Sequence, residues 1–132
     1  MSELGTLHWP TELRLKRAEK LLEISFEDGA QFRLPAEYLR VESPSAEVQG
    51  HGPGQKQLVA GRADVGIVRI EPVGHYAVRI VFDDGHDTGI FSWTYLHELG
   101  SEHERRWADY LTALARAGLS RDTTSRNQGG HA

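Results

Sequence analysis

The chain has no cysteine among its 132 residues. Disulfide bonds, thiolate metal sites, cysteine nucleophiles and cysteine-ligated iron–sulfur clusters are therefore excluded for this chain alone. It also lacks any run that approaches the roughly 18 apolar residues of a membrane-spanning helix. The first residues carry Glu3 where a signal peptide is positively charged. We therefore expect a cytoplasmic protein that does not associate with membranes.

A basic surface is missing as well. The formal net charge is −4, with 15 Lys and Arg residues against 19 Asp and Glu residues. The densest basic stretch, residues 14–20, is itself interrupted by Glu19. A nucleic-acid-binding protein needs a basic face that displaces counterions from phosphates. We therefore expect no nucleic-acid partner.

The sequence motifs of familiar enzyme classes are absent too. The glycine-rich stretch 50–54 is followed by Gln55-Lys56, so it lacks the Gly-Lys-Ser or Gly-Lys-Thr of a phosphate-binding loop. The sequence has no Gly-x-Ser-x-Gly elbow, no His-Glu-x-x-His zinc motif and no His-x-Asp or His-x-Glu pair of a non-haem iron site. We therefore expect that the protein is not an enzyme.

What the chain does contain is an apparent internal repeat. Apolar and polar residues alternate in short segments, as in half-buried strands, and the hairpin signal Asp28-Gly29 recurs as Asp84-Gly85. The two halves carry matching apolar positions: Leu13, Leu15, Leu22, Ile24, Phe26 and Tyr38-Leu39 in the first, and Val68, Ile70, Val78, Ile80, Phe82 and Tyr95-Leu96 in the second. The pattern predicts an α+β fold, a small single domain of two pseudo-repeated β-β-turn-β-α units packed on a common core.

A C-terminal amphipathic helix follows the second unit. Ser101 and Glu104 have the spacing of a capping box, which predicts that this helix begins at Ser101. Its apolar face has three- and four-residue spacing: Trp107, Tyr110, Leu111 and Leu114. Gly118 predicts the end of the helix.

These signals divide the chain into three parts. Residues 1–8 form an N-terminal lead-in, residues 9–118 form the domain with its C-terminal helix, and residues 119–132 form a polar, glycine-rich tail that we expect to be disordered. Between the two units, residues 43–64 are too long and too rich in Gly and Pro for a simple connection. Such loops are usually functional or mobile.

Histidines are the residues best suited to metal or proton chemistry here. We interpret five of the seven as incidental or surface residues: His8, His75, His97, His103 and His131. His51 lies among glycines that allow a ligand to approach closely, and His86 follows the second Asp-Gly turn where the first has Ala30. A simple loop or turn role is the alternative for both residues. The acidic residues of the two turns suit turn formation better than cation binding.

Several short blocks of sequence are similar to those of a known family. They are residues 26–29, 34–40 and 43–52 in the first half, and residues 64–67, 71–74, 82–86 and 93–96 in the second. Together they cover roughly Trp9 to Gly100 and resemble the gamma-butyrobetaine hydroxylase-like N-terminal domain family. In bacteria this family occurs largely as stand-alone proteins of unknown function. Elsewhere it precedes the oxygenase domain of carnitine-pathway hydroxylases, or is fused to Mrp-type P-loop ATPases linked to iron–sulfur assembly.

The resemblance also implies a zinc site. In the hydroxylases the domain holds zinc with three cysteines and one histidine. The cysteine positions fall on Ser43, Ser45 and Val48 of this chain, and the histidine position falls on His86. A serine hydroxyl is a poor zinc ligand and valine is none, so we expect this zinc site to be absent or very weak. We also expect no oxygenase domain, so the resemblance implies the fold without the activity.

Three functional hypotheses follow. The first is a non-catalytic interaction module that serves iron–sulfur or other metallocofactor maturation, with an Mrp-type ATPase or another iron–sulfur assembly factor as its protein partner. The second is a metal-binding protein whose candidate ligands for a divalent iron or zinc ion are His86, His51, Glu42 and Glu47. The third is an enzyme of unfamiliar type with His51 or His86 as its acid–base group, beside residues 43–64. The sequence indicates no oligomeric state.

Overall fold

The computed structural model describes residues 8–50 and 56–122. Within these residues the chain forms two three-stranded antiparallel sheets and four helices. The strands are β1 (Pro10–Lys16), β2 (Leu21–Phe26), β3 (Gln31–Pro35), β4 (Ile67–Val73), β5 (Ala77–Phe82) and β6 (Ile90–Ser92). The helices are α1 (Ala36–Val41), α2 (Ala46–Gln49), α3 (Trp93–Ser101) and α4 (His103–Ala117). The structure is a small single α+β domain, as the sequence predicts.

Each sheet turns at its Asp-Gly pair. Asp28 accepts a hydrogen bond at Oδ1 from the backbone N–H of Ala30 (2.9 Å), and the glycine between them has a φ of 92°. Asp84 accepts the same bond from the N–H of His86 (3.0 Å), and its glycine has a φ of 93°. Glycine adopts such positive φ values without steric cost. Both sheets also place their middle strand second in sequence, although the wider internal repeat stays a prediction.

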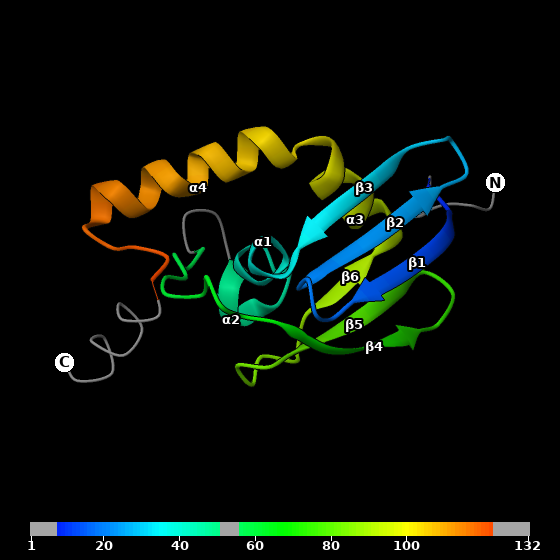
Figure 1. The fold of residues 1–132 in the computed structure, drawn as a ribbon, viewed down its shortest axis with the longest axis horizontal. Helices are drawn as coiled ribbons and strands as arrows, with labels where there is room; N and C mark the ends of the chain where they lie inside the picture. The colour runs from blue at the N-terminus through cyan, green and yellow to red at the C-terminus, as the bar shows by residue number, and fades with distance from the viewer. Residues whose placement is uncertain (1–7, 51–55, 123–132) are drawn as a thin grey trace.

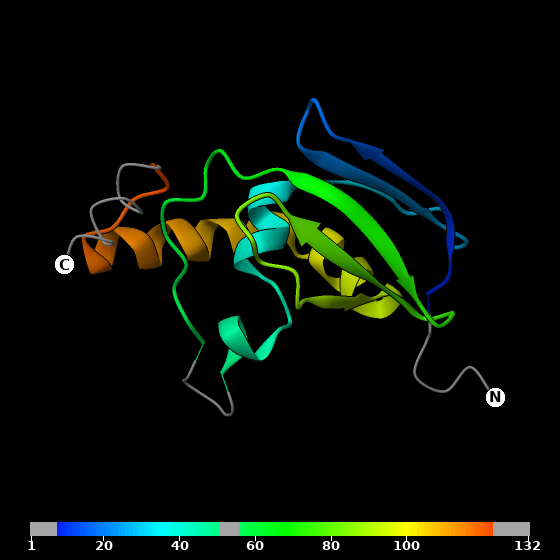
Figure 2. The ribbon, with the colours of Figure 1, turned by 90° about the horizontal axis from the view of Figure 1, so that it is seen from below.

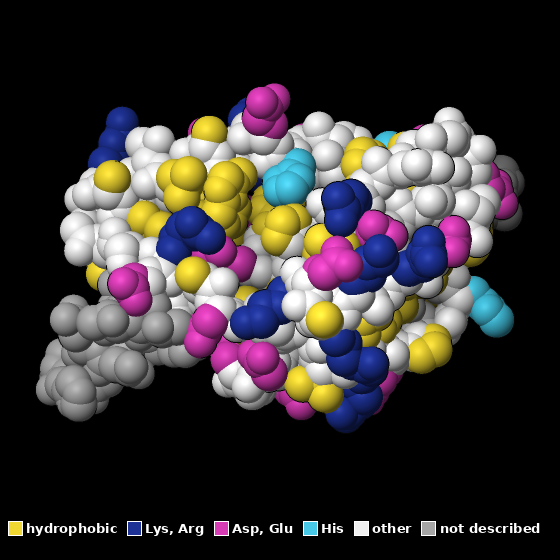
Figure 3. Space-filling view, in the orientation of Figure 1, with side chains coloured by type: hydrophobic (Ala, Val, Ile, Leu, Met, Phe, Trp, Pro, Cys, Tyr) yellow, Lys and Arg dark blue, Asp and Glu magenta, His cyan; other side chains and the backbone are white. Residues whose placement is uncertain are grey.

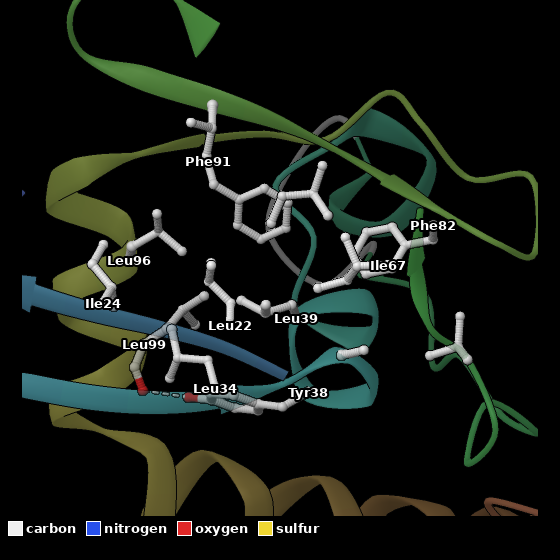
Figure 4. Packing of buried hydrophobic residues seen from close by; sticks show 14 of the residues in the cluster. Leu22, Ile24, Leu34, Tyr38, Leu39, Ile67, Phe82, Phe91, Leu96 and Leu99 are labelled. Atoms are coloured by element: carbon white, nitrogen blue, oxygen red, sulfur yellow. Dashed lines mark hydrogen bonds between the residues drawn. The ribbon is translucent and has the colours of Figure 1, made fainter. Parts of the chain in front are cut away.

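The two sheets bury their inner faces in one common apolar cluster (Figure 4). Alternate residues of β2 and β5 enter this cluster, and α1 and α3 add side chains from the side. Tyr38 of α1 is fully buried, and its hydroxyl donates a hydrogen bond to the carbonyl oxygen of Leu99 in α3 (2.7 Å). Figures 1 and 2 show the sheets as two layers, with α4 projecting to one end. The two halves therefore share a single core.

A bulge in β4 corrects one predicted core position. Val68, which the repeat pattern places among the inner residues, is 42% exposed. The pairing of β4 with β5 shifts register between Ile67 and Arg69, so β4 holds one extra residue there. Ile67 is buried as a result, and Val68 faces outward. The prediction was wrong because alternation alone does not reveal a bulge.

The start of the last helix also differs from the prediction. Ser101 is the last residue of α3, and its hydroxyl lies 3.4 Å from Nδ1 of His97 instead of capping α4. The helix cap that does form is at Ser92, whose Oγ accepts a hydrogen bond from the N–H of Tyr95 (3.0 Å). Helix α4 begins after Glu102, whose side chain binds arginines on α4. The capping-box prediction was wrong because the helix before it runs on through its serine.

A second, smaller cluster holds α4 to the domain. It consists of Val41, Val59, Ala60, Trp107, Tyr110 and Leu114. Leu111, the remaining residue of the predicted apolar face, is 40% exposed. Gly118 adopts a left-handed conformation with φ of 70° and ends α4, which confirms the predicted stop.

The segment after Gly118 is placed against the loop that leads into β4. The sequence pattern assigns residues 119–122 to a disordered tail, but the N–H of Gly61 donates to the carbonyl oxygen of Ser120 and the N–H of Ala63 to that of Arg121, both at 2.9 Å. Backbone groups distant in the chain therefore hold Ser120 and Arg121 at the start of the predicted tail. The rest of the predicted tail, residues 123–132, lies outside the described residues, as do residues 1–7 of the lead-in.

The outer face of the first sheet carries alternating charges (Figure 3). Glu23 pairs with Arg33 (3.1 Å) and lies 3.8 Å from Lys16, and Glu19 also pairs with Arg33 (3.5 Å). Basic side chains on this face are therefore interrupted by acids. None of the described helices combines the length and apolar character needed to cross a membrane.

Candidate functional site

His86 is held at the end of β5 by the second Asp-Gly turn. Its backbone N–H is bound by Asp84, and its carbonyl oxygen accepts a hydrogen bond from the N–H of Phe82 (2.9 Å). The side chain is only 4% exposed and lies beside the Phe82 ring, with a centroid separation of 5.9 Å. Backbone and ring contacts together fix the direction of both imidazole nitrogens.

Two serines meet the inner nitrogen of this ring. They follow α1 directly, and both are buried. Nε2 of His86 lies 2.9 Å from Oγ of Ser43 and 3.3 Å from Oγ of Ser45, and the two hydroxyl oxygens are 3.3 Å apart. Three polar atoms from two distant segments therefore form one buried triangle.

The outer nitrogen of His86 faces α2. Nδ1 lies 2.9 Å from Oε1 of Glu47, which also accepts a hydrogen bond from the hydroxyl of Thr88 (2.9 Å). A carboxylate is only an acceptor, so we assign the ring proton to Nδ1, and Nε2 then accepts from a serine hydroxyl. Burial, reinforced by the positive charge of Arg40, lowers the pKa of His86 below its ordinary value, which favours this neutral form.

An ion-pair cluster stabilises the Asp84-Gly85 turn that carries His86. Asp84 binds Nε of Arg40 and Nε of Arg62, both at 2.8 Å, and all three side chains are largely buried. Burial works to raise the pKa of Asp84, but the hydrogen bond from the His86 backbone and the charge of Arg40 together lower it. The carboxylate therefore stays charged and keeps the turn in place.

Ser43, His86 and Glu47 are connected in the order of a Ser-His-acid triad. A catalytic serine of this kind has to be reached by a substrate carbonyl. Ser43 is 0% exposed, and a Cβ added to Gly89 would lie 2.4 Å from its Oγ, so the backbone of Gly89 packs directly on the hydroxyl. The described structure therefore offers a substrate no path to this oxygen, and the hydrogen-bonded chain is part of the core.

The predicted metal ligands do not all come together. The structure joins Glu47 to His86, but the carboxylate of Glu42 lies 2.8 Å from Nζ of Lys56 and 3.0 Å from Nη1 of Arg106. His51, the fourth candidate ligand, lies outside the described residues. The sequence marks both Glu47 and His86 as candidate ligands. It carries no signal that their side chains are in contact.

An open hollow of about 440 Å³ lies next to Glu42. The end of α1, residues 56–59 and one face of α4 surround it. Its lining is mixed, because Leu58 (37% exposed) and Val59 contribute apolar surface while Arg105 and Lys56 contribute charge. Apart from the unusual composition of residues 43–64, nothing in the sequence predicts this hollow.

Three other residues that the sequence treats separately also converge. His8, Asp28 and His97 offer ligand atoms that all lie within 4.8 Å of one another. The sequence alone predicts an incidental role for His8, a surface position for His97 and turn formation for Asp28. Their separation in the chain hides the grouping, and no local motif marks it.

Fold and site together define a small two-sheet α+β domain with a buried serine–histidine cluster. The chain matches the family described as gamma-butyrobetaine hydroxylase-like, N-terminal, over residues 13–97, and it belongs to that family. The resemblance inferred from short sequence blocks is thereby confirmed. No curated protein matches the chain.

Solved structures with similar sequences share the fold. An NMR solution structure is 48% identical, covering 89% of this chain and 93% of the other, with a TM-score of 0.79. A second NMR solution structure is 50% identical, covering 92% and 90%, with a TM-score of 0.76. A crystal structure of a protein of unknown function from Acidithiobacillus ferrooxidans, assigned to the DUF971 family, is 43% identical, covering 70% and 93%, with a TM-score of 0.60.

The residues present do not fit the zinc ion that the family resemblance implies. The separations within the Ser43, Ser45 and His86 triangle, 2.9 to 3.3 Å, are close to the roughly 3.3 Å edge of a tetrahedron of nitrogen and oxygen ligands around zinc. The ligand types are wrong, however, because neutral hydroxyls replace two thiolates and the buried Val48 replaces the third. The three polar atoms thus have separations typical of metal ligands, but hydrogen bonds connect them.

Proposed function

We propose that this domain acts as a non-catalytic interaction module in the cytoplasm. The burial of Ser43 carries this proposal. Among the described residues, the Ser43–His86–Glu47 chain is a constellation with catalytic connectivity, and its hydroxyl is closed off by Gly89. Both imidazole nitrogens of His86 are used within the fold. This arrangement stabilises the domain and offers nothing to a substrate.

The hollow beside α4 is the surface that we assign to the partner. It combines exposed apolar surface at Leu58 with charged groups at Lys56 and Arg105. Protein interfaces commonly combine an apolar centre with a polar rim, and arginine is enriched in them. Arg106 is held behind this surface by ion pairs with Glu42 and Glu102, so the wall is preorganised.

The family resemblance supplies the first partner to test. Members fused to Mrp-type P-loop ATPases suggest that a stand-alone member contacts such an ATPase, or another iron–sulfur assembly factor, as a separate chain. The function would then be to bring together components of metallocofactor maturation. The absence of cysteine from this chain fits an accessory role, since the chain cannot carry a thiolate-ligated cluster itself.

Site-specific photo-crosslinking in the native cytoplasm tests this proposal. A photoreactive amino acid replaces Leu58 in the hollow, and the matched control carries it at Val68, which has similar exposure (37% and 42%) on the edge of the second sheet. We expect one reproducible protein to be captured from position 58 and not from position 68, and Arg105→Glu to reduce its capture several-fold. Equal capture from both positions, or none from position 58, would contradict the proposal.

The same preparation tests the alternative of an enzyme. A fluorophosphonate probe labels an accessible, activated serine, and we expect it to leave Ser43 unlabelled because that hydroxyl is buried. Labelling of Ser43 that is lost in His86→Ala would favour the enzymatic alternative instead. The metal-binding alternative at His86 is less well supported, because both of its ring nitrogens already have partners.

A further inference from the structure

His8, Asp28 and His97 form a compact cluster at one end of the molecule. His8 precedes β1, Asp28 lies in the turn between β2 and β3, and His97 lies on α3. Nε2 of His97 is 2.9 Å from Oδ2 of Asp28, and Nδ1 of His8 is 3.6 Å from the same oxygen. Two imidazole nitrogens from different segments thus converge on one carboxylate oxygen.

The surroundings hold two of these groups in fixed orientations. Oδ1 of Asp28 is occupied by the N–H of Ala30, which leaves Oδ2 directed at the imidazoles. The ring of His97 packs edge-to-face on Phe26, with a centroid separation of 4.8 Å, and its Nδ1 lies 3.4 Å from the hydroxyl of Ser101. A partner at the outer nitrogen is the usual way in which a metal-binding histidine is oriented.

We propose that His8, Asp28 and His97 form a binding site for a divalent first-row transition-metal ion such as Zn²⁺. Two imidazoles and one carboxylate are a donor set typical of zinc, iron, nickel and copper, whereas Ca²⁺ and Mg²⁺ prefer oxygen ligands alone. The site is half-exposed: the side chains of His8, Asp28 and His97 are 31%, 47% and 15% accessible. Solvent can therefore supply the remaining ligands.

The distances between ligand atoms suit a single ion. Ligands at about 2.0–2.1 Å from zinc lie roughly 3.3 Å apart in a tetrahedron. Two edges, 2.9 and 3.6 Å, bracket this value, and the third is within 4.8 Å. The two imidazole rings stack with centroids 3.6 Å apart and planes at 12°. For both nitrogens to point at one ion, the more exposed His8 ring has to tilt out of this stack.

Such an ion would join three segments that are separate in the sequence. It would fix the chain before β1 to the first hairpin and to α3, so binding should stabilise the folded state by an amount that rises with the logarithm of the free metal concentration once this exceeds Kd. The hairpin lies at the opposite end of the molecule from the C-terminal end of α4 (Figure 1). None of the three metal ligands lines the hollow that forms the proposed partner surface, so failure of one proposal leaves the other untouched.

Calorimetric titration of the full, untagged chain with Zn²⁺ at pH 7.5 tests the site. We expect one ion per chain, and at least a tenfold weaker Kd in His8→Ala and in Asp28→Asn. The asparagine keeps an oxygen that accepts the Ala30 N–H bond, so the turn should survive, and thermal melts without metal check folding. His75→Ala, in the turn between β4 and β5, and His86→Gln are controls that should bind as wild type does.

A spectroscopic readout assigns the ligands directly. With Cu²⁺ as the probe, we expect the electron paramagnetic resonance spectrum of the wild type to show coupling to two imidazole nitrogens, reduced to one in His8→Ala. Mg²⁺ should not compete. The proposal is overturned if the wild type shows no saturable Zn²⁺ binding, if His8→Ala and Asp28→Asn bind with unchanged Kd, or if the loss occurs in the His86→Gln control.

Discussion

The imidazole of His86 connects three segments of the chain through its two nitrogens. Ser43 and Ser45 come from the end of α1, and Glu47 comes from α2. A buried polar group of this kind is stabilising only when all of its hydrogen-bonding atoms have partners. The hydrogen bonds of His86 therefore stabilise the fold at positions where the family resemblance implies metal ligands in the hydroxylases.

Restoring thiolates to this position should restore a metal site. In the triple variant Ser43→Cys/Ser45→Cys/Val48→Cys, three thiolates and His86 give the donor set of a structural zinc site. We expect tight, one-to-one Co²⁺ binding with the sulfur-to-metal absorption band of a tetrahedral thiolate site, and a melting temperature that rises with added metal.

The absorption band separates this site from any other in the chain, because the wild type has no sulfur ligand from cysteine. Adding His86→Ala to the triple variant should weaken Co²⁺ binding at least tenfold. A triple variant that folds but gives no thiolate band would show that the four positions do not retain a tetrahedral arrangement.

At the scale of residues, the sequence predicts which positions belong to the site better than it predicts their side-chain contacts. The resemblance placed Ser43, Ser45 and His86 at corresponding positions, and the structure brings them into contact. That Glu42 would pair with Lys56 and Arg106 could not be foreseen, because side-chain direction after a short helix depends on tertiary packing. Convergence of residues as distant in the chain as Asp28 and His97 has no local signature at all.

Among the elements, α3 lies very close to the first sheet at Gly100. A Cβ added to Gly100 would lie 2.3 Å from Cγ of Phe32 on β3. These atoms are at the base of the aromatic ring, so a small rotation of the side chain does not move them away. Glycine is needed here for the distance between helix and sheet, since its backbone lies within a regular helix.

Gly100→Ala should therefore destabilise the protein, although alanine is the better helix former. We expect the free energy of unfolding to fall by about 1–3 kcal/mol, the usual range for overpacking a filled core. In a Phe32→Ala background the same substitution should become neutral or stabilising by about 0.5–1 kcal/mol, because only helix propensity remains. Urea unfolding of the four proteins in this cycle measures the coupling. A stabilising Gly100→Ala in the wild type would contradict the close packing.

Strands were easier to foresee than helix ends. Alternation at Leu22, Ile24 and Phe26 predicted β2, because each second residue has to enter the core. The boundary between α3 and α4 was missed because Ser101 satisfies the local capping pattern while the helix before it continues. The bulge after Ile67 was missed because it is a shift in the pairing of β4 with β5, which the alternation within β4 does not reveal.

For the whole molecule, burial of histidines links stability to pH. Burial lowers the pKa of His103, which stacks on Tyr38, and burial with the charge of Arg40 lowers that of His86. The acidic side chains that face His86 are Glu47, Asp84 and Asp87, and their opposing effect does not reverse this direction. The folded state therefore prefers both rings neutral.

The unfolded chain consequently binds more protons than the folded chain once the pH falls below about 6.5, the ordinary value for histidine. We expect the free energy of unfolding to be lower at pH 5.5 than at pH 7.5, a window above the titration of the carboxylates. Urea unfolding across this window should give a shallower slope for His86→Gln and a still shallower one for His86→Gln/His103→Gln. A stability that rises as the pH falls would rule out this account.

The short pairing between residues 61–63 and 120–121 bears on how fast the domain comes apart. The two paired segments are distant in the chain, and Arg121 also donates hydrogen bonds from Nε and Nη2 to the carboxylate of Glu37 on α1. We expect these peripheral contacts to form after the rate-limiting step of folding, in which case their loss mainly speeds unfolding. We therefore expect a chain that stops at Gly118 to refold at the rate of the full chain and to unfold faster. The pairing of residues 61–63 with 120–121 would then set the unfolding rate of the native state and leave its folding rate unchanged.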